Sequence, residues 1–163
     1  MSEPNCTFRE YRPDDRQQVE LCVVELQNFE RRLEPCLTTG EQMAASYLRR
    51  LLQKIQDKSG SLTVSLVGDT IAGFVSSWCD GPEDPLESDF TCCGYIGELV
   101  VLPQYRGLGI GKALMERAES FLLAHNPQAI YIEVLSRNSA AVELYRNLGF
   151  RHNKLRLIKE IER

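Results

Sequence analysis

The chain has 163 residues, of which 43% are hydrophobic and 26% charged, a composition typical of one globular domain with a sizeable core. Its net charge of −4 argues against nucleic-acid binding, which usually needs a basic surface, and mildly favours cationic partners. No apolar run is long enough to span a membrane, and none follows residues 1–4 as a secretory leader would. We therefore expect a cytoplasmic protein that binds neither nucleic acid nor membrane.

Cysteine usage bounds the chemistry further. The six cysteines contain no C-x-x-C pair, and only two histidines accompany them. We therefore expect no metal site, and thiols kept reduced as in a cytosol. Cys92 and Cys93 are adjacent and could be redox-active, but two small residues leading into a strand are the preferred interpretation.

The first half of the chain predicts strands at both ends of a helical pair. Apolar residues recur at helical spacing in two stretches and alternate with polar residues in the two stretches that follow. The expected elements are a strand over 7–11, a helix opened by Pro13 and ended by Pro35, a helix capped by Thr38 or Thr39 and ended by Ser59, and a hairpin of strands over 62–66 and 71–79.

The second half predicts strands that alternate with helices. The expected elements are a strand over 94–102, a helix over 112–124, a strand over 129–135, a helix over 139–148 stopped by Gly149, and a last strand or hairpin over 150–160. The order is β-α-α-β-β-β-α-β-α-β, and the strand–helix–strand unit over 94–135 is a parallel crossover. The sequence therefore predicts a single domain over 1–163 of the α/β class, with a mixed sheet and helices on both sides.

A glycine-rich turn joins the strand over 94–102 to the helix after it. Gly107, Gly109 and Gly111 follow Arg106 there, and such a turn gathers backbone N–H groups at a helix N-terminus, where phosphate binds. A Walker loop is excluded because Arg106 stands where its first glycine belongs and Ala113 where its Ser or Thr belongs. The glycine spacing also fits a dinucleotide fingerprint poorly.

Two motifs together resemble the GNAT superfamily of acyl-CoA-dependent N-acetyltransferases. The first is R-x-x-G-x-G from Arg106, and the second is N-x-x-A-x-x-x-Y-x-x-x-G-F over 138–150. The resemblance is strong over 94–150, and the residues of the two motifs are similar to those of the diamine and spermidine/spermine N-acetyltransferases. The same motif residues occur in many bacterial members, so they do not identify the acceptor.

The resemblance implies acetyl-CoA as cosubstrate. Main-chain groups at the end of the strand over 94–102 would pair with the pantetheine arm, amides of 107–112 would hold the pyrophosphate, and the segment from Asn138 would contact the lower arm. The cofactor-binding residues so implied are Leu99, Val100, Val101, Arg106, Gly107, Leu108, Gly109, Ile110, Gly111, Lys112, Asn138, Ser139, Ala140 and Ala141.

The resemblance also implies two catalytic residues. Tyr145 is at the family's proton-donor position, and a tyrosine hydroxyl has an acidity close to that of a thiol. Glu98 lies one residue before the cofactor-pairing segment, where an acidic residue acts as base or binds the cationic acceptor. Glu133 is a weaker candidate for that role, and His125 is expected to be a helix-end group rather than a catalyst.

Charge along the chain favours a cationic acceptor. The segment over 80–93 carries five acidic residues and no basic one, whereas Arg106, Lys112 and Arg117 surround the phosphate loop. We expect transfer of an acetyl group to a primary amine of a small cationic molecule, such as a polyamine, an aminoglycoside or an amino-acid-like amine, by direct attack. The alternatives are a protein N-terminus or lysine as acceptor, or a non-catalytic acyl-CoA sensor. Many relatives dimerise, so a homodimer is expected by analogy alone.

Overall fold

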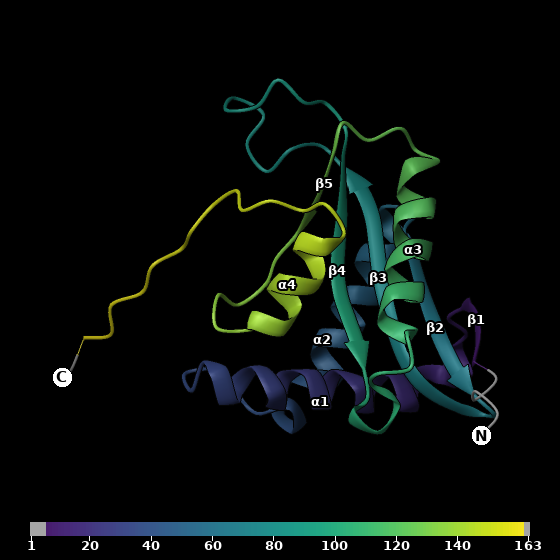
Figure 1. The fold of residues 1–163 in the computed structure, drawn as a ribbon. Coiled ribbons are helices and arrows are strands. Elements are labelled where there is room, and N and C mark those ends of the chain that lie inside the picture. The colour runs from purple at the N-terminus through teal and green to yellow at the C-terminus, as the bar shows by residue number, and fades with distance from the viewer. Residues whose placement is uncertain (1–5, 162–163) are drawn as a thin grey trace. The chain divides into compact units, whose positions relative to one another are not determined.

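A computed structural model describes residues 6–161, which form two compact units divided after Glu133 (Figure 1). The prediction that no secretory leader follows residues 1–4 concerns residues that lie partly outside the described ones. Across the part of the chain that is described, no helix combines the length and apolar composition needed to cross a lipid bilayer. Each unit is described by itself below.

The first unit is built on one mixed sheet. Its strands lie in the order β1-β2-β3-β4-β5, and every neighbouring pair is antiparallel except β4 with β5, which is parallel as predicted. The elements are β1 (Cys6–Glu10), a 3-10 turn (Pro13–Asp15), α1 (Arg16–Leu33), α2 (Gly40–Asp57), β2 (Ser61–Val67), β3 (Thr70–Asp80), β4 (Cys93–Val101), a 3-10 turn (Pro103–Tyr105), α3 (Ile110–Leu123) and β5 (Ala129–Ile132).

Helices cover both faces of this sheet. Figure 1 shows α3 on one face, while α1 and α2 lie on the other. The α1–α2 side holds the main apolar core, in which Val19, Leu48 and Phe74 are completely buried. On the α3 side, Leu114 and Leu122 are equally buried. The predicted mixed sheet with helices on both faces is confirmed, and β4, which carries Glu98, lies in it between β3 and β5.

A partly buried ion pair fixes the entry to α1. The two terminal guanidinium nitrogens of Arg9 on β1 donate to the carboxylate of Asp15 at 2.6 and 2.8 Å, and the Arg12 N–H donates to it at 2.7 Å. Asp15 is only 6% exposed. The hydrogen bond from Arg9 is the main cause that lowers the pKa of Asp15 below its ordinary value, so the carboxylate stabilises the fold in its charged form.

Replacing Asp15 by asparagine is expected to lower the free energy of unfolding by about 1–2 kcal/mol at neutral pH, because charged hydrogen bonds are lost in a buried place. The carboxylate contributes its full stability above the unfolded-state pKa near 3.8, and that contribution is lost as the pH falls through the lower folded-state value. Urea unfolding from pH 7 to pH 2 should therefore show wild type and Asp15→Asn converging in acid. Exposed Asp14 is the matched control, and an Asp14→Asn change as large as that of Asp15→Asn would contradict the assignment.

In the second unit, residues 134–163, the part described up to residue 161 contains one helix, α4 (Ser139–Asn147). The Asn138 side chain caps its start by accepting from the Ala141 N–H at 3.3 Å. Its end is a Schellman motif, in which Phe150 N–H donates to Tyr145 O, Gly149 N–H donates to Arg146 O, and Gly149 has φ +92°. The predicted helix and its glycine stop are confirmed.

The last strand predicted over 150–160 is wrong for the described residues. Residues 150–161 form no helix or strand, and Leu155, Leu157 and Ile158 are between 68% and 84% exposed. A strand needs a partner strand to bond its backbone, and the described part of this unit offers none. Apolar residues at alternate positions were therefore not sufficient to predict a strand over 150–160.

Candidate active site

A β-bulge positions Glu98 on β4. Val75 pairs with Leu99 and Ser77 with Ile96, so two residues of β4, Gly97 and Glu98, stand opposite the single Ser76 of β3. A Cβ on Gly97 would lie 2.6 Å from the Ser76 hydroxyl, which explains a glycine at this close approach. The bulge turns Glu98 into a buried place, where the residue is 8% exposed.

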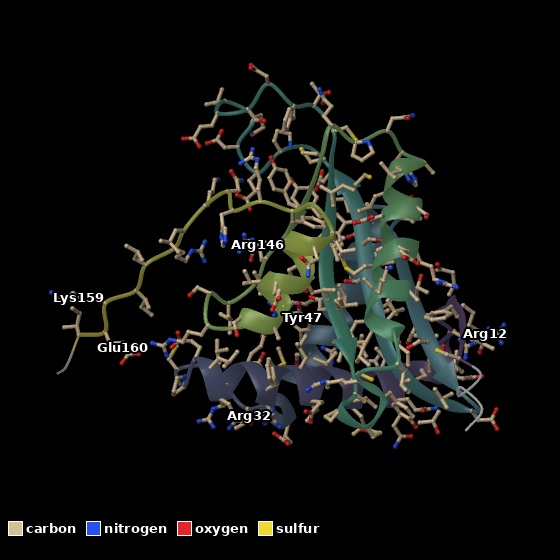
Figure 2. All side chains as sticks on the ribbon, in the orientation of Figure 1. Arg12, Arg32, Tyr47, Arg146, Lys159 and Glu160 are labelled. Carbon is tan, nitrogen blue, oxygen red and sulfur yellow. The ribbon has the colours of Figure 1, made fainter. Side chains whose placement is uncertain are left out.

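Both carboxylate oxygens of Glu98 are hydrogen-bonded. The Ser76 hydroxyl donates to Oε2 at 2.5 Å and also accepts from the Glu98 N–H at 3.0 Å, which satisfies an amide that the bulge takes out of the ladder. The Tyr47 hydroxyl, which projects from α2 toward the sheet, donates to Oε1 (Figure 2). A carboxylate has room for about four hydrogen bonds, so Glu98 can still accept from an amine or a water.

Tyr47 acts as a fixed donor to this carboxylate. Burial is the main cause that raises the pKa of Tyr47 well above its ordinary value, and the charge and hydrogen bond of Glu98 add to it. The hydroxyl therefore keeps its proton over the physiological range and donates to Glu98. The guanidinium of Arg50 lies over the Tyr47 ring, 6.0 Å from its centre.

A second carboxylate, Glu30 of α1, belongs to the same cluster. Burial, followed by the negative charge of Glu98, raises the pKa of Glu30 above its ordinary value. The charge of Glu30 also contributes to the raised pKa of Tyr47. Neither Glu30 nor Tyr47 was singled out from the sequence. Glu30 lies four residues after Leu26, within the apolar spacing of α1, and this position was the only sequence feature that could have indicated a buried carboxylate.

The strands β4 and β5 part next to this cluster. Their parallel pairing ends at Ile96 and Ile132, immediately before the bulge, so in the described unit residues 97–101 have a partner strand only on the β3 side. This is why β5 ends at Ile132 rather than at Leu135 as predicted. The Leu102 N–H bonds Ala72 on β3, so alternation turns the Val101 carbonyl to the other edge, where Arg106 Nε donates to it at 2.9 Å.

The N-terminus of α3 presents a row of backbone donors. Gly107 and Gly109 have φ of +78° and +75°, and α3 begins at Ile110, two residues earlier than predicted. Arg106 N–H donates to Pro103 and Ala113 N–H to Gly109, but among the described residues the amides of 107–112 between them donate to no backbone oxygen. A Cβ built on Gly111 would lie 3.7 Å from a Val101 side-chain carbon, so this row lies beside the end of β4. Such a row attracts an anion.

The three basic residues near this loop differ in their contacts. The Arg106 guanidinium bonds Val101 and lies 5.6 Å from the centre of the Phe29 ring. Arg117 bonds the Ala113 carbonyl and lies over the Phe8 ring at 3.7 Å, so it is turned toward β1. Lys112 is exposed and makes a long pair of 3.9 Å with Glu116. Lys112 is therefore the cation best placed to reach a ligand at the loop.

The remaining candidates from the first unit, Glu133, His125 and the acidic segment over 80–93, make contacts that need no catalytic role. Glu133 is exposed and follows the end of β5, which agrees with a surface carboxylate. The Nδ1 of His125 lies 2.9 Å from the Phe121 carbonyl oxygen at the end of α3, which agrees with a helix-end group. In the acidic segment over 80–93, Asp80 pairs with Lys58 at 2.8 Å, and that bond is the main cause that lowers the pKa of Asp80.

The remaining predicted residues lie in the second unit. Asn138, predicted to touch the cofactor, uses its side-chain oxygen to cap α4. Tyr145 is buried, and its ring packs edge-on against Phe150 with 6.1 Å between ring centres. Ser139 and Ala140 begin α4 and are exposed. Within this unit, Asn138 at the cap and Tyr145 in the last turns therefore belong to one short, well-capped helix.

The comparisons identify the family. The sequence model of the Acetyltransferase (GNAT) family matches residues 26–150. The chain belongs to this family. It is 32% identical over 121 residues to an uncharacterised N-acetyltransferase of Archaeoglobus fulgidus, a match that covers 74% of this chain and 78% of that protein.

Two further acetyltransferases extend the comparison. The chain is 40% identical to an N-alpha-acetyltransferase of Sulfurisphaera tokodaii over 63 residues. This match covers 38% of this chain and only 38% of that enzyme's length. An aminoglycoside N-acetyltransferase solved in complex with CoA has the same fold, with a TM-score of 0.69 at 14% identity over 98% of this chain and 95% of that chain. The likeness to the diamine and spermidine/spermine members is not confirmed by these matches.

The α3 loop fits the donor that the family uses. Acetyl-CoA is the acyl donor of GNAT proteins, and its diphosphate needs several N–H donors and little steric hindrance. The amides of 107–112 supply the donors. Ideal Cβ atoms on Gly107 and Gly109 would meet no atom within 4 Å, so the loop offers open space where side chains would otherwise stand.

Proposed function

We propose that this protein is an acetyl-CoA-dependent N-acetyltransferase, and that both units form one catalytic domain over 1–163. The observation that supports this most directly is the row of amides at the α3 N-terminus, set beside the part of β4 that has no β5 partner. Acetyl-CoA supplies the activated acetyl group. The pantetheine arm is expected along Leu99, Val100 and Val101, with the diphosphate on residues 107–112.

The chain's own residues perform the proton transfers in this proposal. The Glu98 carboxylate takes the proton from the acceptor ammonium, directly or through water, while Tyr47 and Ser76 hold it in place. A main-chain N–H near Val100 stabilises the negative charge that develops on the carbonyl oxygen. The Tyr145 hydroxyl donates a proton to the departing sulfur. The neutral amine attacks directly, so no covalent enzyme intermediate is needed.

The proposed acceptor is a small molecule with a primary amine and further positive charge. Glu98 and Glu30 form a cluster of like charge that a cation would stabilise. The exposed acidic residues of the segment over 80–93 add a negative field on the approach. Polyamines, aminoglycosides and amino-acid-like amines all meet this description, and the aminoglycoside enzyme with the same fold is consistent with it.

A second candidate acceptor is a protein N-terminus. The similarity to the N-alpha-acetyltransferase of Sulfurisphaera tokodaii favours this acceptor, because that match has the higher identity of the two sequence relatives reported. A peptide would bring one α-amine to Glu98 and would not need the acidic segment.

An acceptor screen tests both candidates. The folded protein, supplied with acetyl-CoA, is assayed with a thiol-detecting dye against polyamines, aminoglycosides, amino acids and short peptides. We expect CoA release with at least one cationic small molecule. Peptide-only release would select the second candidate. No release with any amine, together with normal acetyl-CoA binding, would select a non-catalytic acyl-CoA sensor, and no binding either would overturn the function. Cytoplasmic location and a homodimer stay predictions.

Replacing Tyr145 by phenylalanine removes the proton donor but keeps the ring that packs on Phe150. It is expected to lower kcat by about tenfold, less than the roughly 10²–10⁴-fold typical of general acid–base catalysis, because a thiolate is already a good leaving group. The dissociation constant of CoA should stay unchanged, since the diphosphate donors lie on another element. Stopped-flow or steady-state thiol release checks the rate, and calorimetry checks binding. If the wild type and Tyr145→Phe have the same kcat at every pH measured, Tyr145 has a packing role only.

A further inference from the structure

The sequence drew attention to the adjacent Cys92 and Cys93, but the strand register separates them. Cys79 of β3 pairs with Gly94 of β4, and Asp80 pairs with Cys93. Neighbouring residues of a strand point to opposite faces of the sheet. Cys93, the first residue of β4, therefore points away from the face of Gly94 and is completely buried, whereas Cys92 lies just before the strand.

Cys79 and Cys92 lie on the same face, the one covered by α3. A Cβ on Gly94 would lie 3.1 Å from a Leu122 methyl of α3, so Gly94 and its partner Cys79 face that helix. Cys92 precedes Gly94 by two residues, and its Sγ lies 4.0 Å from the His125 carbonyl oxygen beyond the end of α3. Both thiols are half-buried.

The two thiols also interact with each other. Burial is the first cause that raises the pKa of Cys79, and the charge and side-chain hydrogen bond of Cys92 are the next causes. The Gln128 side chain holds this place, since its oxygen accepts from the Thr91 N–H at 2.7 Å and from the Cys92 N–H at 3.2 Å. Cys79 in β3 and Cys92, anchored by Gln128, therefore stand at the two ends of the acidic segment.

From this geometry we infer that Cys79 and Cys92 are a modification site, at which a peroxide oxidant forms an intramolecular disulfide. The Cys92 thiolate sulfur attacks hydrogen peroxide, the O–O bond breaks, and Cys92 sulfenic acid and hydroxide result. The hydroxide takes up the proton that the Cys92 thiol had released and becomes the first water. The Cys79 sulfur then displaces the sulfenic oxygen, which leaves as a second water, and the S–S bond forms. Peroxide gains the two electrons that the two thiols lose. The cross-link fastens residue 79 to residue 92 and closes the acidic segment between them.

The test uses the reduced full chain, hydrogen peroxide, alkylation of the remaining thiols and mass spectrometry. Trypsin with an endoproteinase that cuts before aspartate yields peptide 69–79, which carries Cys79, and peptide 89–106, which carries Cys92 and Cys93. We expect these two peptides to become linked, with the loss of two hydrogen atoms, and to separate again on treatment with a dithiol reductant. Fragmentation of the linked wild-type peptides should place the bond on Cys92.

Two serine variants form the matched pair. Cys93→Ser should keep the link and Cys92→Ser should lose it. Because Cys93 is buried and its variant can fail to fold, the fragmentation of the wild-type peptides stands as an independent measurement. A bond to Cys93, Cys79 still fully alkylated after peroxide, or a link found only in a covalent dimer on a non-reducing gel would each overturn the inference.

Discussion

Replacing Glu98 by glutamine is expected to lower kcat by roughly 10²–10³-fold, the range in which a positioned general base contributes. Glutamine has the same shape, but its amide cannot take a proton from the acceptor. Its NH₂ group would also face one of the two hydroxyl donors, Tyr47 or Ser76, so the free energy of unfolding should fall by about 1 kcal/mol. Steady-state thiol release, with the best acceptor of the screen, measures the effect.

Two control variants separate chemistry from packing in this test. Tyr47→Phe removes a hydrogen bond to Glu98 but keeps the carboxylate, so it should cost less than about tenfold in kcat, the equivalent of one hydrogen bond. Glu133→Gln changes an exposed carboxylate one residue past β5 and should have no effect. A Glu98→Gln enzyme with normal kcat and a raised KM would instead assign Glu98 to binding the acceptor ammonium.

The parts of the site that the sequence predicted are those specified by local rules. A strand, a glycine-rich turn and a helix in succession dictate a donor row at 107–112 whatever the rest of the chain does, and the structure has that row. The cap and the stop of α4 follow from Asn138 and Gly149 in the same way. Local sequence was sufficient for these features because each depends on residues that are close in the chain.

The residues that sequence reasoning missed depend on long-range register. Tyr47 is separated from Glu98 by 51 positions, and its hydrogen bond exists only because α2 packs over the bulge in β4. From the sequence Tyr47 continues the apolar spacing of Met43 and Leu51 and is an ordinary core residue. The bulge itself has no clear sequence signal besides Gly97, so neither the direction of Glu98 nor the early end of β5 was predictable.

Replacing Gly109 by alanine is expected to weaken CoA binding by about tenfold or more, which corresponds to about 1.4 kcal/mol. Gly109 has φ +75°, where a side chain is strained, and it precedes the first residue of α3. A methyl group there enters the open space beside the amides of 107–112, and the backbone turns to relieve the strain. Both effects misalign donors that must converge on one diphosphate. Isothermal titration calorimetry with CoA measures the change.

Gly68 provides the control for this prediction. It has φ +61° in the turn between β2 and β3, and a Cβ there would also meet no atom within 4 Å. Gly68→Ala should therefore cost the same backbone strain as Gly109→Ala, about 1–2 kcal/mol in the free energy of unfolding, while leaving CoA binding unchanged. If both variants lose affinity in proportion to their stability, the loss is a general effect of destabilisation. If only Gly109→Ala loses affinity, the α3 N-terminus is the diphosphate site, because strain is equal in the two proteins and only the position differs.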